Sequence, residues 1–196
     1  MDPSKIQNDI KKLQEEYYKT NTKNSFFKNK QKLECAETIT QSYDLNVLLN
    51  NTIYIIPNTN SIFFDYTVFK MFASPANYSA CVEHITNTIN YMISTNDSYN
   101  VHINLNSFTV TAYERYKQLI IDFCNICFNN SLSFYSKLGK IYIYNTPNMF
   151  DTITRLLSPF VDPTINSKMI TYNKTGTNEI LICSNNSFIE YITKLK

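Results

Sequence analysis

The chain has 196 residues, a net charge of +2 at pH 7 and a hydrophobic content of 43 %. This composition is rich enough in apolar residues for a globular core and excludes wholesale disorder. The small net charge excludes the strongly basic surface of a dedicated nucleic-acid-binding protein. The sequence contains two glycines, Gly139 and Gly176, which are too few for a glycine-rich phosphate-binding loop.

The first residues, the length of the apolar runs and the number of cysteines indicate the cellular location that we expect. Residues 1–12 are polar and charged and lack the apolar stretch of an export signal. No apolar run approaches the roughly 20 residues that cross a bilayer. Five cysteines, an odd number without an export signal, are typical of a reducing compartment. We therefore expect a cytoplasmic protein whose contact with membranes, if any, is peripheral.

The first 44 residues differ in composition from the rest. An apolar stripe at helical spacing predicts an amphipathic helix over residues 4–19, formed by Ile6, Ile10, Leu13 and Tyr17. The Lys- and Asn-rich stretch 20–32 is expected to be a loop or linker. Its lysines indicate either a solvated surface or an arm that touches anionic lipid.

Beyond residue 45, segments rich in β-branched and aromatic residues alternate with apolar helical stripes. Strands at 52–56 and 61–68 flank the turn at 57–60 and predict a β-hairpin. The remaining elements are expected in this order: helix 76–93, strand 101–106, helix 113–128, strand 140–144, helix 148–158, strands 168–172 and 179–183, and helix 187–195. Such alternation is typical of an α/β layer architecture.

The helix expected at 148–158 is strongly amphipathic. Its apolar side comprises Phe150, Ile153, Leu156, Leu157 and Phe160, and its polar side comprises Asp151, Thr154, Arg155 and Ser158. Thr146 is expected to cap the helix ahead of Pro147, and prolines 159 and 163 are expected to end it. The spacing alone is compatible with an ordinary core helix or with a movable paddle.

Several residue types at fixed spacing surround this helix. They are Asn145 and Pro147 after a strand, the aromatic Phe150, the run Pro159-Phe-Val-Asp-Pro163, and Thr164 and Lys168 before the next strand. This pattern resembles the CRAL-TRIO lipid-binding domain of the phosphatidylinositol and phosphatidylcholine transfer proteins, in a compact and divergent form. The resemblance extends over roughly residues 45–185.

The resemblance implies a fold, a function and a set of site residues. The fold would be a mixed sheet covered by helices, with a shortened N-terminal lobe at 1–44 and a lipid-binding lobe at 45–196. One phospholipid, such as phosphatidylinositol, or another hydrophobic molecule would be enclosed beneath a gate helix. Lys168 would lie near the headgroup, and the gate and cavity lining would be Phe150, Ile153, Leu157 and Phe160. The expected partners are this ligand and, transiently, a membrane surface, with a monomeric protein, a possible protein partner and no nucleic acid.

The sequence also departs from the family pattern. Ser136 stands where the family has a glutamate that pairs with the headgroup lysine, and Asn104 stands where a strand usually ends in Asp. Lys168 can therefore be a headgroup ligand or a solvated surface lysine. The alternative function is a protein-interaction or structural module that keeps the fold but has lost lipid binding.

Signals for catalysis or metal binding are weak. Cys124 and Cys127 lie inside an apolar helix without a second ligand pair, so they are interpreted as core residues. His84 and His102 show no spacing typical of a catalytic triad and are interpreted as structural. We therefore expect no enzyme, no cofactor, no metal site and no catalytic residue.

Overall fold

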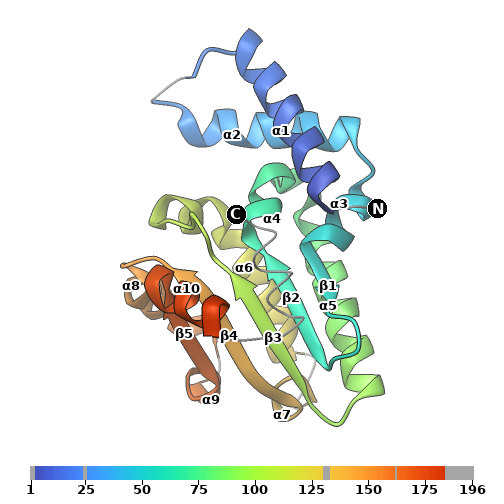
Figure 1. The fold of residues 1–196 in the computed structure, drawn as a ribbon, viewed down its shortest axis with the longest axis vertical. Coiled ribbons are helices and arrows are strands. Elements are labelled where there is room, and N and C mark those ends of the chain that lie inside the picture. The colour runs from blue at the N-terminus through green and yellow to red at the C-terminus, as the bar shows by residue number, and fades with distance from the viewer. Residues whose placement is uncertain (1–2, 24–25, 130–132, 162, 184–196) are drawn as a thin grey trace.

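A computed structural model describes residues 3–23, 26–129, 133–161 and 163–183. Within these ranges a five-stranded sheet crosses the molecule, and helices cover it (Figure 1). The strands lie in chain order: β1 (Ile53–Ile55), β2 (Ser61–Asp65), β3 (Tyr99–Asn104), β4 (Leu138–Thr146) and β5 (Met169–Asn173). The predicted α/β class with a mixed sheet is confirmed.

The direction of each strand follows from its connection. β1 and β2 form the predicted antiparallel hairpin, whereas β2, β3, β4 and β5 pair in parallel. Parallel neighbours need a crossover, which is usually helical. The crossovers are α4 (Tyr66–Phe72), η1 (Pro75–Asn77) and α5 (Tyr78–Thr95), then α6 (Val110–Asn129) and α7 (Ser133–Ser136), then α8 (Phe150–Leu157), η2 (Ser158–Phe160) and α9 (Pro163–Asn166).

The N-terminal helices lie together at one end of the sheet (Figure 1). They are α1 (Pro3–Thr20), α2 (Lys28–Ser42) and α3 (Leu45–Thr52). The apolar stripe predicted for α1 is buried, with Ile6 and Ile10 in one core cluster with Ile39, Leu48 and Phe72. The three N-terminal helices therefore share a core with α4, which follows β2.

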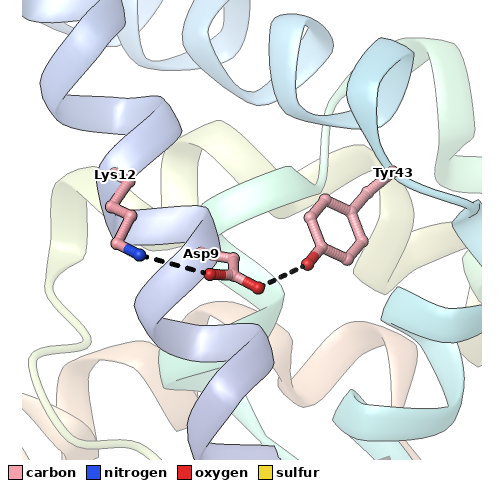
Figure 2. Close-up of polar contacts among 3 residues, drawn as sticks. All are labelled: Asp9, Lys12 and Tyr43. Atoms are coloured by element: carbon pink, nitrogen blue, oxygen red, sulfur yellow. Dashed lines mark hydrogen bonds and ion pairs between the residues drawn. The ribbon is translucent and has the colours of Figure 1, made fainter.

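A polar contact also fastens α1 to the segment that follows α2. The Tyr43 hydroxyl donates a hydrogen bond of 3.0 Å to Asp9, and Lys12 lies 3.7 Å from the other oxygen of that carboxylate (Figure 2). The exposed Lys12 pair contributes little because water screens it. The tyrosine contact joins residues 34 positions apart in the sequence and sets how α1 lies on its neighbour.

Three sequence-based expectations about elements were wrong. The loop expected over 20–32 ends at Lys28, where α2 begins and buries Cys35, Ala36 and Ile39. The strand expected at 61–68 stops at Asp65, because that side chain accepts a hydrogen bond from the Thr67 N–H and caps α4. The strand expected at 179–183 belongs to a helix, α10 (Lys174–Cys183). The helix expected at 187–195 lies outside the described residues.

Helix α10 is stabilised at its start by a side-chain hydrogen bond that the residue composition of this segment did not indicate. The Asn173 side chain accepts a hydrogen bond of 2.8 Å from the Gly176 N–H, which satisfies a donor of the first turn. Thr177 is buried, and its hydroxyl accepts a hydrogen bond from the Asn145 N–H. Capping and packing against β4 therefore outweigh the β-branched residues of 180–183.

Candidate ligand cavity

A cavity of about 380 Å³ lies between one face of the sheet and the helices α6 and α8. Its floor consists of alternate strand residues, because successive side chains of a strand point to opposite faces. They are Ile62 and Phe64 from β2, Val101 and Ile103 from β3, and Ile141 and Ile143 from β4. The volume falls within the roughly 300–1,000 Å³ of small-molecule sites.

Helices complete the walls of this cavity. α6 contributes Leu119, Ile120, Phe123, Cys124 and Cys127. Burial raises the pKa of the Cys124 thiol to about 11 and that of Cys127 to about 12, so both stay protonated at neutral pH. These thiols therefore act as small apolar side chains in the wall.

The four residues expected on the gate all line the cavity. Phe150, Ile153 and Leu157 come from α8, and Phe160 comes from η2. Ile153 is the most deeply buried of them. Leu156, expected on the same side, is 44 % exposed, whereas Thr154 and Ser158, expected on the polar side, line the cavity. The inner face is therefore rotated slightly from the predicted one.

The start of α8 also differs from the expectation. The helix begins at Phe150, and Met149 rather than Thr146 is its capping residue, without a side-chain hydrogen bond. Thr146 ends β4, and the Pro147 carbonyl accepts a hydrogen bond from the Phe150 N–H. Pro147 therefore stiffens the turn that leads into α8 instead of occupying its first turn.

The cavity wall is uncharged throughout the part of the chain that the structure describes. Its strongly polar groups are the Thr154 and Ser158 hydroxyls and the Asn166 amide, together with tyrosine hydroxyls at the edges. An isolated charge in such surroundings would be expensive, whereas apolar groups of a ligand gain about 25 cal/mol per Å² of buried area. The cavity is therefore suited to a ligand that is mainly hydrocarbon.

Lys168 lies directly before β5 and is not part of the wall. Its ammonium donates hydrogen bonds of 2.6 Å to the backbone carbonyls of Tyr135 and Leu138, two residues that do line the cavity. An ammonium has three N–H donors, so these contacts leave one. Ser136, at the position of the family's glutamate, is exposed on α7. Lys168 thus joins the α7–β4 connection to β5 beside the cavity.

A buried polar network, which the sequence did not reveal, lies at the carboxyl ends of the parallel strands. Asn104 ends β3 and is 1 % exposed. Its side-chain oxygen accepts a hydrogen bond of 2.9 Å from the Asn145 amide, and its own amide donates one of 3.4 Å to Asp65. Asn145 adopts a φ of 55°, a left-handed conformation that asparagine tolerates better than most residues.

This network explains the asparagine of the Asn-x-Pro motif. Asn145 holds the end of β4 to β3 through its side chain and to α10 through Thr177. The chain then leaves the sheet at Pro147 and enters α8. Asn145 therefore orients the entry into α8, which lines the cavity. Its partners Asn104 and Thr177 come from distant positions, so spacing along the chain could not identify them.

Asp65 supplies the carboxylate that Asn104 does not. It ends β2, and Asp65 and Asn104 are register partners in the sheet. Burial raises the pKa of Asp65, while hydrogen bonds from Thr67, Val68 and Asn104 oppose that rise. A buried carboxylate on the neighbouring strand therefore lies in contact with Asn104.

The opposite face of the sheet carries aromatic side chains. The His102 ring stacks on Tyr142 at 4.7 Å between centroids, and its Nδ1 lies 2.9 Å from the Tyr144 hydroxyl. Burial lowers the pKa of His102 to about 4. The imidazole is therefore neutral at physiological pH and contributes to packing, as the sequence indicated.

Comparisons with known proteins agree on the architecture. The fold is similar to the crystal structure of Sfh5, with a TM-score of 0.51 and 17 % identity over 76 % of this chain and 55 % of that one. The chain thus spans about half the length of that solved chain, and at this identity the likeness shows the fold. The sequence has no significant match among curated proteins. Among the described helices, none is long and apolar enough to cross a membrane.

The family model supplies the remaining finding. The model of the CRAL/TRIO domain matches residues 65–190, which is more than half of the chain. The match begins at the buried Asp65 and includes the cavity floor from β3 to β5 and the helix α8. The chain belongs to the CRAL/TRIO family of lipid-binding domains, as the motif around residues 145–168 predicted.

Proposed function

We propose that this protein binds one hydrophobic ligand in the cavity between the sheet and helices α6 and α8, and exchanges it at a membrane. The observation that carries the proposal is the uncharged, apolar wall of a cavity of about 380 Å³. A core whose sole purpose is stability has few voids larger than a water molecule. A cavity of this size therefore supports occupation by a ligand.

Helix α8 with η2 is the proposed gate. Each buried CH₂ of a ligand contributes about 0.8 kcal/mol, so a fully enclosed hydrocarbon leaves a rigid pocket slowly. A wall segment that exchanges apolar contacts with a bilayer lowers that barrier. Phe150, Ile153, Leu157 and Phe160 provide such contacts, and the prolines at 147 and 159 stiffen both ends of the segment.

The ligand proposed here is a phospholipid, such as phosphatidylinositol, or another mainly apolar molecule. The uncharged wall favours a ligand whose charged group stays at the mouth of the cavity or is absent. The position of Lys168 beside Tyr135 and Leu138 would allow its third N–H to reach a phosphate there. The proposal involves no covalent step.

The direct test is the identity of what the protein carries. We expect lipid mass spectrometry of purified, denatured protein to recover a hydrophobic molecule at close to one per chain. Absence of any such molecule, together with no uptake of fluorescent lipid from vesicles, would contradict the proposal. That outcome would favour the alternative of a protein-interaction module that has lost its ligand.

The gate itself is tested by adjacent leucines. Leu157→Asp places a charge on the cavity wall and is expected to reduce ligand uptake at least tenfold, because the buried charge loses its hydration. Leu156→Asp on the exposed side of the same helix is the matched control and should leave uptake nearly unchanged. The chain lacks tryptophan, so Phe160→Trp in either background gives a single tryptophan, which can be excited apart from the tyrosines and reports ligand entry. Equal uptake by both aspartate variants would exclude α8 as the gate.

Lys168 is tested by comparing two ligands. If its ammonium pairs with a phosphate, Lys168→Gln reduces binding of phosphatidylinositol but leaves binding of an uncharged lipid unchanged. If it only joins Tyr135 and Leu138 to β5, the variant weakens both equally and lowers the unfolding midpoint. Binding titrations with both lipids, together with thermal unfolding, separate these roles.

A further inference from the structure

Two large apolar side chains directly before α2 are exposed, and neither lines the cavity. Phe26 is 93 % exposed and Phe27 is 65 % exposed, the two highest values among the exposed large hydrophobic residues that the structure describes. Single exposed apolar residues are common, whereas two adjacent exposed phenylalanines form an apolar patch of the kind that marks an interaction surface. This region also lies outside the segment matched by the family model.

Positive charge is concentrated around the same two residues. Residues 17–33 contain five lysines and no Asp or Glu, whereas the whole chain has a net charge of only +2. The lysines are Lys19, Lys23, Lys28, Lys30 and Lys32. Lys30 forms an exposed ion pair with Glu34 at 3.9 Å, which water screens. Aromatic side chains surrounded by lysines are the composition of segments that bind the surface of anionic bilayers.

The positive surface continues onto neighbouring helices. Arg115 of α6 donates a hydrogen bond of 2.8 Å to Asn29 at the start of α2, which joins the two elements. The pKa of Lys32 is lowered by burial and then by the charges of Arg115, Lys28 and Lys70. Lys32 of α2 is therefore close enough to Arg115, Lys28 and Lys70 to be repelled by each of them. An anionic surface would relieve that repulsion.

We propose that Phe26 and Phe27, together with the lysines that flank them in the sequence, form a docking site for anionic phospholipid bilayers. Phe26 and Phe27 insert into the interface between headgroups and acyl chains, and the surrounding lysines, with Lys70 and Arg115, pair with lipid phosphates. Electrostatic attraction brings the protein to the surface, and the aromatic pair holds it there. This docking does not require that the cavity hold a ligand.

Vesicle flotation with the full chain tests this site. The vesicles are pure phosphatidylcholine, or phosphatidylcholine with 30 % phosphatidylserine, at low salt and in 0.5 M NaCl. We expect binding to the anionic vesicles that falls at least tenfold in high salt and is weak on neutral vesicles. Phe26→Ser with Phe27→Ser should lower binding at least tenfold. Tyr91→Ser, which removes an aromatic ring that is 59 % exposed on α5, is the matched control and should change it little.

Charge is tested separately from the aromatic pair. Lys23→Glu with Lys28→Glu should abolish the preference for anionic vesicles, whereas Lys117→Glu, an exposed lysine of α6, should weaken binding much less. Unchanged binding of the double phenylalanine variant would overturn the proposal. So would a dimer in light scattering that this variant abolishes while vesicle binding persists, because the two phenylalanines would then bind a second copy. Ligand content measured on the same variants separates failure of this site from failure of the proposed cavity function.

Discussion

At the scale of single residues, Asp65 and Asn104 form a matched pair. Asn104→Asp would place two carboxylates at hydrogen-bond distance in a buried site, so we expect a loss of about 3 kcal/mol or more of stability. The swap Asp65→Asn with Asn104→Asp keeps one carboxylate and one amide, and it should recover more than half of that loss. Urea denaturation of the wild type, of Asn104→Asp and of the swapped variant measures both values. Equal stability of the single and swapped variants would show that the two side chains do not interact.

His102 predicts a pH dependence. Its folded-state pKa of about 4 lies below the ordinary value of 6.5, because burial disfavours the imidazolium. Between these values the unfolded chain binds the proton and the folded chain does not. The contribution of His102 to stability is therefore complete above pH 6.5 and is lost as the pH falls from 6.5 to 4.

The check is a comparison across pH. We expect His102→Gln to flatten the decline in the free energy of unfolding between pH 6.5 and 4. Asp65 acts in the opposite direction, because its raised pKa makes the folded state gain stability as the pH falls through that pKa. The difference between wild type and His102→Gln isolates the histidine. An unchanged slope would show that the ring is accessible to water.

At the scale of elements, we expect the two glycines to respond differently to substitution by alanine. A Cβ on Gly139 would lie 2.7 Å from the Asn100 side-chain oxygen, which accepts a hydrogen bond from the Lys140 N–H where the β3–β4 register shifts. Gly139→Ala must displace that oxygen, so we expect a loss of roughly 1–2 kcal/mol. A Cβ on Gly176 in α10 would meet its nearest atom at 3.5 Å, which is ordinary contact.

Gly176→Ala is therefore the matched control. It should be neutral or should stabilise the protein by up to about 1 kcal/mol, because alanine favours helix and restricts the unfolded chain. Thermal unfolding of both variants gives the comparison. A stable Gly139→Ala variant would mean that the Asn100 contact is not needed for the bulge.

At the scale of the whole molecule, the N-terminal helices and the sheet are expected to unfold together. Ile10 of α1 is fully buried in the cluster that contains Leu48 and Phe72. Ile10→Ala should lower the free energy of unfolding by about 2–5 kcal/mol in one transition that includes the sheet. Circular dichroism and tyrosine fluorescence should report the same midpoint. Two separate midpoints would show that residues 1–44 form an independent unit.

The whole molecule also shows why some elements were predictable. Ile6 and Ile10 repeat at helical spacing and face one core, so the pattern predicted α1. Phe150, Ile153 and Leu157 predicted α8 for the same reason. In α2 the buried residues are few, namely Cys35, Ala36 and Ile39, and they lie in a mainly polar segment. The helix packs against α4. In α10 a side-chain cap outweighed residues that favour strands.

The sequence by itself determined the α/β class, the family and most of the apolar side of α8, because these depend on periodicity and on residue types at fixed spacing. The tertiary structure alone decided which distant residues meet. It paired Asp65 with Asn104, turned Lys168 toward two carbonyls and left a cavity above the strands. Contacts between residues 30 or more positions apart depend on how packed elements fit together, and local sequence patterns do not predict that fit.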